Sequence, residues 1–181
     1  MKSFLKKLWH FIWYENSILS WIVNIALAFI IVKFLIYPGL GLILGTSHPL
    51  VAVVSGSMEH DINFNKWWEQ NKDLYAKQNI SKEQFEKFPF RNGFNKGDIM
   101  LLISAKNIDL GDVIVYNGNY KDPIIHRVVK VNGNIYTTKG DHNIPIDPIQ
   151  PKPQEIVGKA VFKVPLLGWV KIIFTKIVGG F

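Results

Sequence analysis

The stretch DPIIHRVVKVNGNIYTTKGD, residues 122–141, decides the fold of this chain. Two runs rich in Val, Ile and Tyr stand on either side of an Asn-Gly pair, and β-branched and aromatic residues favour strands. Asn132 and Gly133 form the dipeptide that most strongly indicates a tight hairpin turn. The stretch therefore predicts two antiparallel strands, with His126 set into the first of them among apolar neighbours.

Short runs of the same kind recur along the chain and predict a mainly β fold. Each run is bounded by Gly, Asp, Asn or Pro, which favour turns. A chain of 181 residues that is 48% hydrophobic can form one domain of about 100 to 150 residues and one additional element. We assign the β-rich domain to residues 45–163. The runs that predict strands are residues 49–54, 96–103, 110–116, 122–131, 134–141 and 156–164.

The additional element is an apolar segment near the N-terminus. Residues 18–36 carry one charge, Lys33, and one amide, Asn24, and their length approaches the roughly 20 residues that cross a hydrocarbon core. The apolar character continues to Leu44, so residues 18–44 are predicted to be a transmembrane anchor. A buried core helix and a cleaved secretory signal are the alternatives. Signals usually have shorter apolar regions that end in a small-x-small cleavage site, and no convincing site follows here.

The charges on either side of this segment predict its orientation. Residues 1–17 contain three lysines, whereas residues 34–65 contain no basic residue. Positive charge favours the cytoplasmic side, so we expect a basic cytoplasmic N-terminus and a β-rich domain on the outer face of the plasma membrane. The net charge of +7 is scattered along the chain. This argues against nucleic acid as a partner and fits attraction to membrane lipid.

Two other segments differ from the β-rich runs. Residues 63–95 form a polar, aromatic-rich insertion, in which Ser81 and Gln84 predict a capping box for a short helix before Pro89. Its aromatic side chains either form a small core of their own or lie against lipid headgroups. Residues 164–181 carry apolar side chains at helical spacing. They predict an amphipathic helix at the membrane interface, with a helix packed on the domain or a second span as alternatives.

The stretch SGSMEH, residues 55–60, follows an apolar run. It is either a simple turn or a serine presented for chemistry. A nucleophilic serine needs a base within hydrogen-bond reach and a third group that orients the base. Of the five histidines, only His126 lies in an apolar run, and either Asp141 or Asp147 in the loop after the next strand could orient it. A purely structural role for His126 is the alternative.

The same loop offers an alternative as a metal site. Asp141, His142 and Asp147 carry ligand atoms, but their spacing matches no standard ligand pattern. The chain has no cysteine, which excludes disulfides and thiolate metal sites. We therefore expect no metal and no cofactor.

Five short motifs follow one another in the chain: SGSME at 55–59, GDVIV at 111–115, HRVV at 126–129, KGDHN at 139–143 with Asp147, and VPLLG at 164–168. Together and in this order they resemble signal peptidase I, in its archaeal and endoplasmic-reticulum branch, in which a histidine takes the place of the bacterial catalytic lysine. The resemblance implies a signal-peptidase-like β-sheet catalytic domain with one N-terminal transmembrane helix and a short C-terminal amphipathic helix.

The resemblance also implies roles for individual residues. Ser57 is similar to the nucleophile, His126 to the general base, and Asp147 to the acid that orients the base. Asp141 resembles the supporting carboxylate of the same loop. Ser55 matches a position whose hydroxyl, in bacterial relatives, helps to form the oxyanion hole together with the backbone N–H of Ser57. The glycine between the two serines would let both face one carbonyl oxygen.

The function implied is that of a membrane-bound serine endopeptidase that removes N-terminal signal peptides from secreted preproteins after small residues. Its expected partners are preproteins and membrane lipid, with the protein translocase as a further candidate. A catalytically silent preprotein-binding subunit is one alternative, and a self-cleaving regulator with Lys130 or Lys139 as base is another. The sequence departs from the family at His60, where relatives usually have proline, and in the length of residues 63–95.

Overall fold

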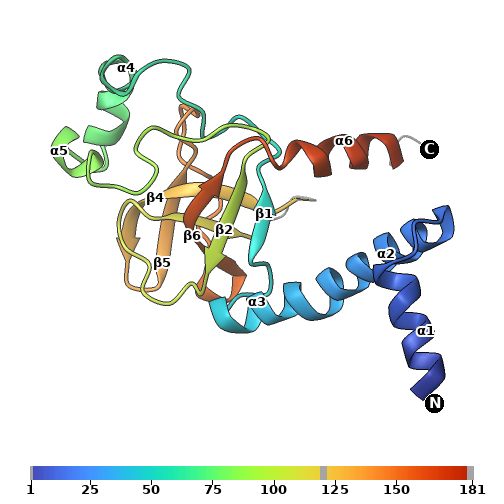
Figure 1. Ribbon diagram of the computed structural model, residues 1–181. Helices are drawn as coiled ribbons and strands as arrows, with labels where there is room; N and C mark the ends of the chain where they lie inside the picture. Colours follow the sequence, from blue (N-terminus) through green and yellow to red (C-terminus); the bar gives the residue numbers. More distant parts are fainter. Residues whose placement is uncertain (1, 119–121, 179–181) are drawn as a thin grey trace. The chain divides into compact units, whose positions relative to one another are not determined.

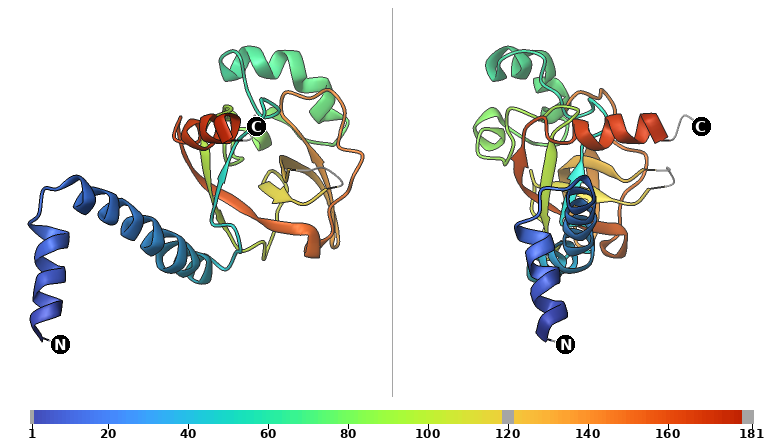
Figure 2. Two further views of the ribbon diagram at one scale, coloured as in Figure 1. Left: turned by 90° about the vertical axis from the view of Figure 1, so that its right-hand side faces the viewer. Right: turned by 45° about the vertical axis from the view of Figure 1, so that its right-hand side comes forward.

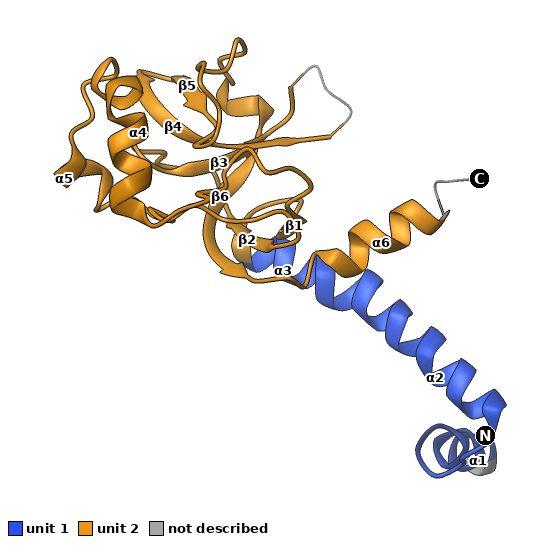
Figure 3. Cartoon of the chain, turned by 90° about the horizontal axis from the view of Figure 1, so that it is seen from above, with its two compact units in different colours: residues 1–43 blue, residues 44–181 orange. Residues whose placement is uncertain are grey.

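The computed structural model describes residues 2–118 and 122–178. The chain divides into two compact units, Met1–Ile43 and Leu44–Phe181 (Figure 3).

The N-terminal unit is helical. Helix α1 (Lys2–Trp13) is followed by α2 (Ile18–Ile31), whose first turn is capped by the Ser17 hydroxyl, which accepts a hydrogen bond from a backbone N–H. A π-helical turn η1 (Val32–Ile36) leads into α3 (Tyr37–Leu44). The wide turn ends two residues before Pro38, which has no N–H and crowds the carbonyl four residues earlier, within the turn.

The continuous helix Ile18–Leu44 is long and apolar enough to span a membrane, as the sequence predicts. Its 27 residues have a mean hydropathy of 2.4 in the most apolar window, and only 6% of that window is buried. A core helix of a soluble protein would be mostly buried, so this alternative does not fit.

The second unit is built on one antiparallel sheet, which confirms the mainly β prediction (Figure 1). Among the described residues the sheet has six strands in the order β1-β2-β6-β3-β4-β5. Strand β6 lies inside the sheet because it pairs with both β2 and β3. The strands are β1 (Leu50–Ala52), β2 (Ile99–Ile103), β3 (Val113–Tyr116), β4 (Ile124–Asn132), β5 (Ile135–Lys139) and β6 (Ile156–Val164).

The predicted hairpin is present between β4 and β5. Asn132 pairs with Ile135 across the turn, and Gly133 has a φ of 57°, which glycine adopts at little cost. On its other side β4 pairs with β3, with His126 opposite Ile114. The histidine is therefore fixed on a strand that has neighbours on both edges.

Both faces of β3 are buried, because successive side chains of a strand point to opposite sides. Val113 and Val115 join a core with Met58 and Phe94, while Ile114 and Tyr116 join a second apolar cluster. Burying a side chain of this size contributes about 1.5–3 kcal/mol. These contacts hold the centre of the sheet in place.

The insertion, residues 63–95, forms helices α4 (Phe64–Ala76) and α5 (Lys82–Phe85), which lie together at one end of the sheet (Figures 1 and 2). The predicted capping box between Ser81 and Gln84 is present. Of the two alternatives for the insertion's aromatic side chains, a small core is present, although Val129 of β4 joins it and Phe94 belongs to the core of the sheet instead. The aromatic members of the small core are Trp67, Trp68, Tyr75 and Phe85.

After β6 the chain forms α6 (Trp169–Val178), which projects beyond the edge of the sheet (Figure 1). The Gly168 N–H donates to the Gly97 carbonyl oxygen and Ile172 is buried, so the start of the helix is fixed to the domain. Residues 179–181 of the predicted amphipathic segment lie outside the described residues. Most of its other large apolar side chains are exposed: Leu166, Leu167, Val170, Ile173, Phe174 and Ile177.

Candidate active site

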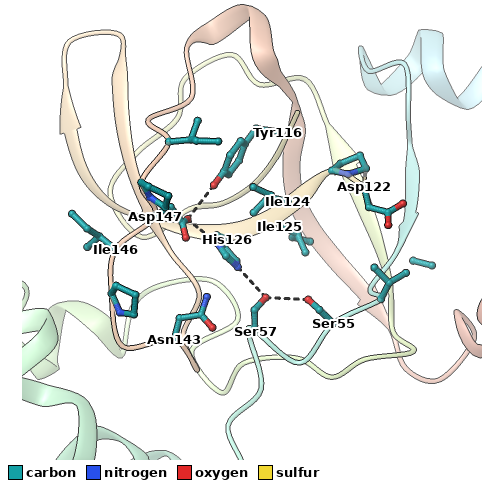
Figure 4. Close-up of a pocket in the computed structure, with 16 residues that line it drawn as sticks. Ser55, Ser57, Tyr116, Asp122, Ile124, Ile125, His126, Asn143, Ile146 and Asp147 are labelled. Carbon is teal, nitrogen blue, oxygen red and sulfur yellow. Dashed lines mark hydrogen bonds and ion pairs between the residues drawn. The ribbon is translucent and has the colours of Figure 1, made fainter. Parts of the chain in front are cut away.

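Three side chains from distant parts of the sequence meet beside one pocket (Figure 4). Ser57 lies in the turn after β1, His126 on β4, and Asp147 in the loop after β5. The His126 Nε2 atom is 2.9 Å from Ser57 Oγ, and its Nδ1 atom is 2.7 Å from Asp147 Oδ2. Serine, imidazole and carboxylate therefore form one continuous hydrogen-bonded chain.

Backbone hydrogen bonds fix the two loops against each other. The His142 N–H donates to the Ser57 carbonyl oxygen at 2.9 Å, which joins the turn after β1 to the loop after β5. The Asp147 N–H donates to the Thr138 carbonyl oxygen at 2.8 Å, so the end of the same loop is tied to β5. The serine and the carboxylate are thus held on either side of a histidine that the sheet itself positions.

Asp147 is held as an ionised acceptor. Burial opposes its ionisation, but hydrogen bonds from His126, Thr138 and Tyr116 outweigh this effect and keep the pKa of the carboxyl below its usual range. The Thr138 and Tyr116 hydroxyls donate to Oδ2 at 2.6 and 3.0 Å. A carboxylate only accepts, so the imidazole carries its proton on Nδ1 and leaves Nε2 free to accept from Ser57.

The sequence did not single out Tyr116 and Thr138. Each carries a hydroxyl and lies within a predicted strand. Whether that hydroxyl can donate to Asp147 depends on which strands pair with each other. Tyr116 lies at the end of β3 and Thr138 on β5, on either side of β4, and β4 carries His126. Only the strand order brings both hydroxyls to one carboxylate.

Ser55 lies beside Ser57, with their hydroxyl oxygens 3.2 Å apart, on the side away from His126 (Figure 4). Gly56, between them, is not in the left-handed region. A Cβ there would lie 2.8 Å from Oε2 of Glu59, at the end of a flexible side chain that would have to shift to admit it.

Asp141 does not join the Ser57–His126–Asp147 chain. It forms a fully buried ion pair with Arg127 at 2.8 Å, and it also accepts from Tyr75 and lies 3.1 Å from His60 Nε2. Burial disfavours its charge, but Arg127 and His60 hold the pKa of the carboxyl well below its usual range. Asp141 is therefore the centre of a second cluster behind the loop.

The alternative metal site does not form among the described residues, where no group of three ligand-bearing side chains converges. His142 turns to Asp61, 3.5 Å away, and both side chains are more than half exposed. Asp147 is bound to His126 and Asp141 is bound to Arg127. The three residues of that loop thus have separate partners.

The two lysines proposed as alternative bases lie elsewhere. Lys130 is exposed on β4. Lys139 is buried, donates to the Gly140 carbonyl oxygen at 2.9 Å, and lies over the ring of Tyr75. Burial, opposed by Asp141, lowers the pKa of Lys139 to about 8. The hydrogen bonds of the Ser57 hydroxyl within the described chain go to His126 and Ser55 instead.

The pocket beside Ser57 has a volume of about 490 Å³ and mostly apolar walls. Ala52, the last residue of β1, and Val54 line it on one side. Ile124 and Ile125 line it from the start of β4 (Figure 4). Apolar walls with a few polar groups at one end are typical of a ligand site. Here Ser57, His126 and Asp147 are among the polar side chains of the lining, together with Ser55, Asn143 and Asp122.

Comparison with known proteins finds relatives over most of the chain, although no family model and no solved structure matches it. The chain is 30% identical over 158 residues to the signal peptidase complex catalytic subunit SEC11 of Fusarium vanettenii, an alignment that covers 79% of this chain and 73% of that protein. The SEC11 subunit of Yarrowia lipolytica is 26% identical over 159 residues (80% and 73%). That of Leptosphaeria maculans is 28% identical over 170 residues (86% and 79%).

The buried Lys139 leads to a prediction about stability. Its pKa is about 8 in the folded protein against 10.5 for an exposed lysine. Between these values the unfolded chain binds more protons, so the free energy of unfolding should rise with pH, by up to about 1.4 kcal/mol per pH unit. Urea unfolding of the detergent-solubilised protein at several pH values should show this rise, and Lys139→Met should lack it. Identical pH dependence in both proteins would contradict the burial of a charged lysine.

Proposed function

This chain belongs to the family of signal peptidase catalytic subunits, and we propose that it is a membrane-bound serine endopeptidase that removes signal peptides from preproteins. The observation that carries this proposal is the continuous chain from Ser57 through His126 to Asp147. A catalytically silent binding subunit would have no need of a base 2.9 Å from a hydroxyl and a carboxylate on its other side. A histidine in this place corresponds to the archaeal type of the family.

The first half of the reaction follows from these distances. His126 Nε2 takes the proton of Ser57 as Oγ attacks the carbonyl carbon of the scissile peptide bond. Asp147 stabilises the imidazolium that forms and keeps it in the productive orientation. The imidazolium then gives its proton to the leaving amine, the peptide bond breaks, and the signal peptide remains attached to Ser57 as an ester.

The second half uses the same groups. His126 takes a proton from a water molecule, whose oxygen attacks the ester carbon. Collapse of this intermediate returns the proton to Ser57 Oγ and releases the signal peptide with a free carboxylate. In both halves negative charge develops on one oxygen. We propose that the Ser55 hydroxyl and the Ser57 N–H donate hydrogen bonds to this oxygen. The Ser55 hydroxyl lies beside Ser57 Oγ and can rotate to donate to the substrate oxygen instead.

The apolar pocket suits a peptide in extended conformation. Such a peptide would pass between the end of β1 and the start of β4, where main-chain hydrogen bonds supply affinity and side-chain pockets supply selectivity. The walls at Ala52, Val54 and Ile125 accept apolar side chains, and the restriction to small residues is what the family resemblance implies.

Two apolar features support attachment to a membrane. The helix Ile18–Leu44 is the proposed anchor, and the lysines before it support the proposal of a cytoplasmic N-terminus and a catalytic domain on the outer face of the plasma membrane. The exposed apolar side chains of α6 are the proposed contact with the membrane interface. The anchor would confine the enzyme to the surface at which the cleavage sites of membrane-inserted preproteins emerge, where a translocase is a candidate partner.

Cleavage of a preprotein by the purified protein tests the proposed activity. Ser57→Ala and His126→Ala should lose activity to a similar extent, because the two residues act as one unit. The exposed Lys130→Ala is the control and should cleave normally. Full activity in His126→Ala would contradict the mechanism.

A second prediction concerns the oxyanion hole. Ser55→Ala should lower kcat by roughly 10²- to 10³-fold, as loss of one such donor typically does, because the charge on the carbonyl oxygen would lose a hydrogen bond. Binding of the preprotein should change little. Single-turnover kinetics measure both quantities, and an unchanged kcat would remove Ser55 from the site.

The orientation can be measured because the chain has no cysteine of its own. A single cysteine at Lys77→Cys, on the exposed end of α4, should react with a membrane-impermeant maleimide added to intact cells. A cysteine at Lys7→Cys in α1 should react only after the membrane is permeabilised. The opposite pattern would place the catalytic domain in the cytoplasm.

A further inference from the structure

The insertion, residues 63–95, meets the back of the active-site loop at Asp141. Tyr75 of α4 donates its hydroxyl to Asp141 Oδ1 at 2.9 Å. His60, just before the insertion, lies 3.1 Å from Oδ2 and is stacked on Trp67 of α4, with 3.6 Å between ring centroids and 10° between planes. The second cluster therefore depends on the insertion for two of its contacts.

The insertion also surrounds the guanidinium of Arg127. Arg127 Nη1 donates to the carbonyl oxygens of Pro89 and Gly111, and Nη2 donates to that of Phe90. The remaining N–H groups donate to Asp141, so all five donors have partners although the side chain is fully buried. A buried ion pair offsets its desolvation only when its remaining hydrogen-bonding groups are satisfied. Pro89, Phe90 and Tyr75 supply much of that requirement.

His60 is held in one tautomer. Its side chain is 1% exposed, and a carboxylate only accepts, so Nε2 carries the proton and donates to Asp141. Its Nδ1 atom is buried and has no hydrogen-bond partner among the described residues. Trp67 covers the flat face of the ring. The His60 ring therefore connects α4 to Asp141: it is stacked on Trp67 and forms a hydrogen bond with the carboxylate.

The loop that carries Asp141 is in direct contact with Ser57. The Asp141 N–H points to Met58 Sδ at 3.3 Å, and the next residue, His142, donates to the Ser57 carbonyl oxygen. There is little free space between them, because a Cβ at Gly140 would lie 2.7 Å from the Ser57 carbonyl oxygen and 2.8 Å from His126 Nε2. A small displacement of this loop would therefore move the nucleophile relative to its base.

We propose that the insertion is an internal clamp for the catalytic loop, and that Tyr75 and His60 are its positioning residues. They fix Asp141, and through the loop 139–143 they fix the distance between Ser57 and His126. Neither residue touches the reacting atoms. The expected effect on kcat rests on the proposed peptidase function. The expected effect on the mobility of the loop rests on the contacts alone.

Three substitutions separate the parts of the clamp. Tyr75→Phe removes the hydroxyl and keeps the ring in the aromatic cluster. His60→Phe keeps a ring against Trp67 and removes the hydrogen bond to Asp141. His60→Gln retains an N–H donor at the distance of Nε2 and removes the ring. Tyr136→Phe is the matched control. It also removes a tyrosine hydroxyl, but from the apolar cluster that contains Ile114 and Tyr116.

Kinetics with a preprotein give the first measurement on the full-length protein. Tyr75→Phe and His60→Phe should each lower kcat by about tenfold or more while KM changes less than about threefold, because misplaced catalytic groups slow chemistry rather than binding. His60→Gln should recover most of kcat, and Tyr136→Phe should match the unsubstituted protein. An unchanged kcat in both Tyr75→Phe and His60→Phe would overturn the clamp.

Amide hydrogen exchange gives a second measurement that needs no activity. The His142 amide, which is bonded to the Ser57 carbonyl oxygen, should exchange faster in Tyr75→Phe and His60→Phe, while the amides of β3 should keep their protection. Equal exchange at His142 in all variants would contradict the clamp, even if kcat falls. If the unsubstituted protein cleaves no preprotein, the proposed function fails, and the exchange data alone still decide whether the insertion holds the loop.

Discussion

The buried ion pair between Arg127 and Asp141 is the interaction on which the second unit depends, because the surrounding segments must supply hydrogen bonds to both charges. Two opposite charges without access to water need a complete set of hydrogen bonds, and in this protein those bonds come from four separate segments. Arg127 follows His126 directly on β4, so the two side chains leave the strand on opposite faces. The same strand thus joins the buried charges on one side to the active site on the other.

Much of the fold could be predicted from the sequence, because its signals are local. The alternation and turn chemistry of residues 122–141 predict the β4–β5 hairpin, and the apolar run near the N-terminus predicts a helix able to span a membrane. The family, predicted from five motifs, is confirmed by the SEC11 relatives. The catalytic roles of Ser57, His126 and Asp147 stay predictions, supported by the distances between them.

What could not be predicted depends on long-range pairing. From the residues alone, Asp141 and Asp147 were two candidates for orienting His126, and the five residues of loop between them give no local signal for which one faces the histidine. Tyr116 and Thr138 gain their importance only from the strand order β3-β4-β5. In the sequence, His60 could be recognised only as a departure from the family pattern. Its contacts are with Trp67 and Asp141, which are 7 and 81 residues away in the chain, so no local pattern indicates its role.

The place of β6 has a consequence for how the sheet assembles. It is the last of the described strands in the chain, yet it pairs with β2 on one edge and β3 on the other. Ser57 follows β1, on the β2 side of β6, and His126 lies on β4, on the β3 side. Without residues 156–164, no described strand would join these two halves of the sheet. The sheet that carries Ser57 and His126 on opposite sides of β6 is therefore closed only by a strand that is synthesised after both of them.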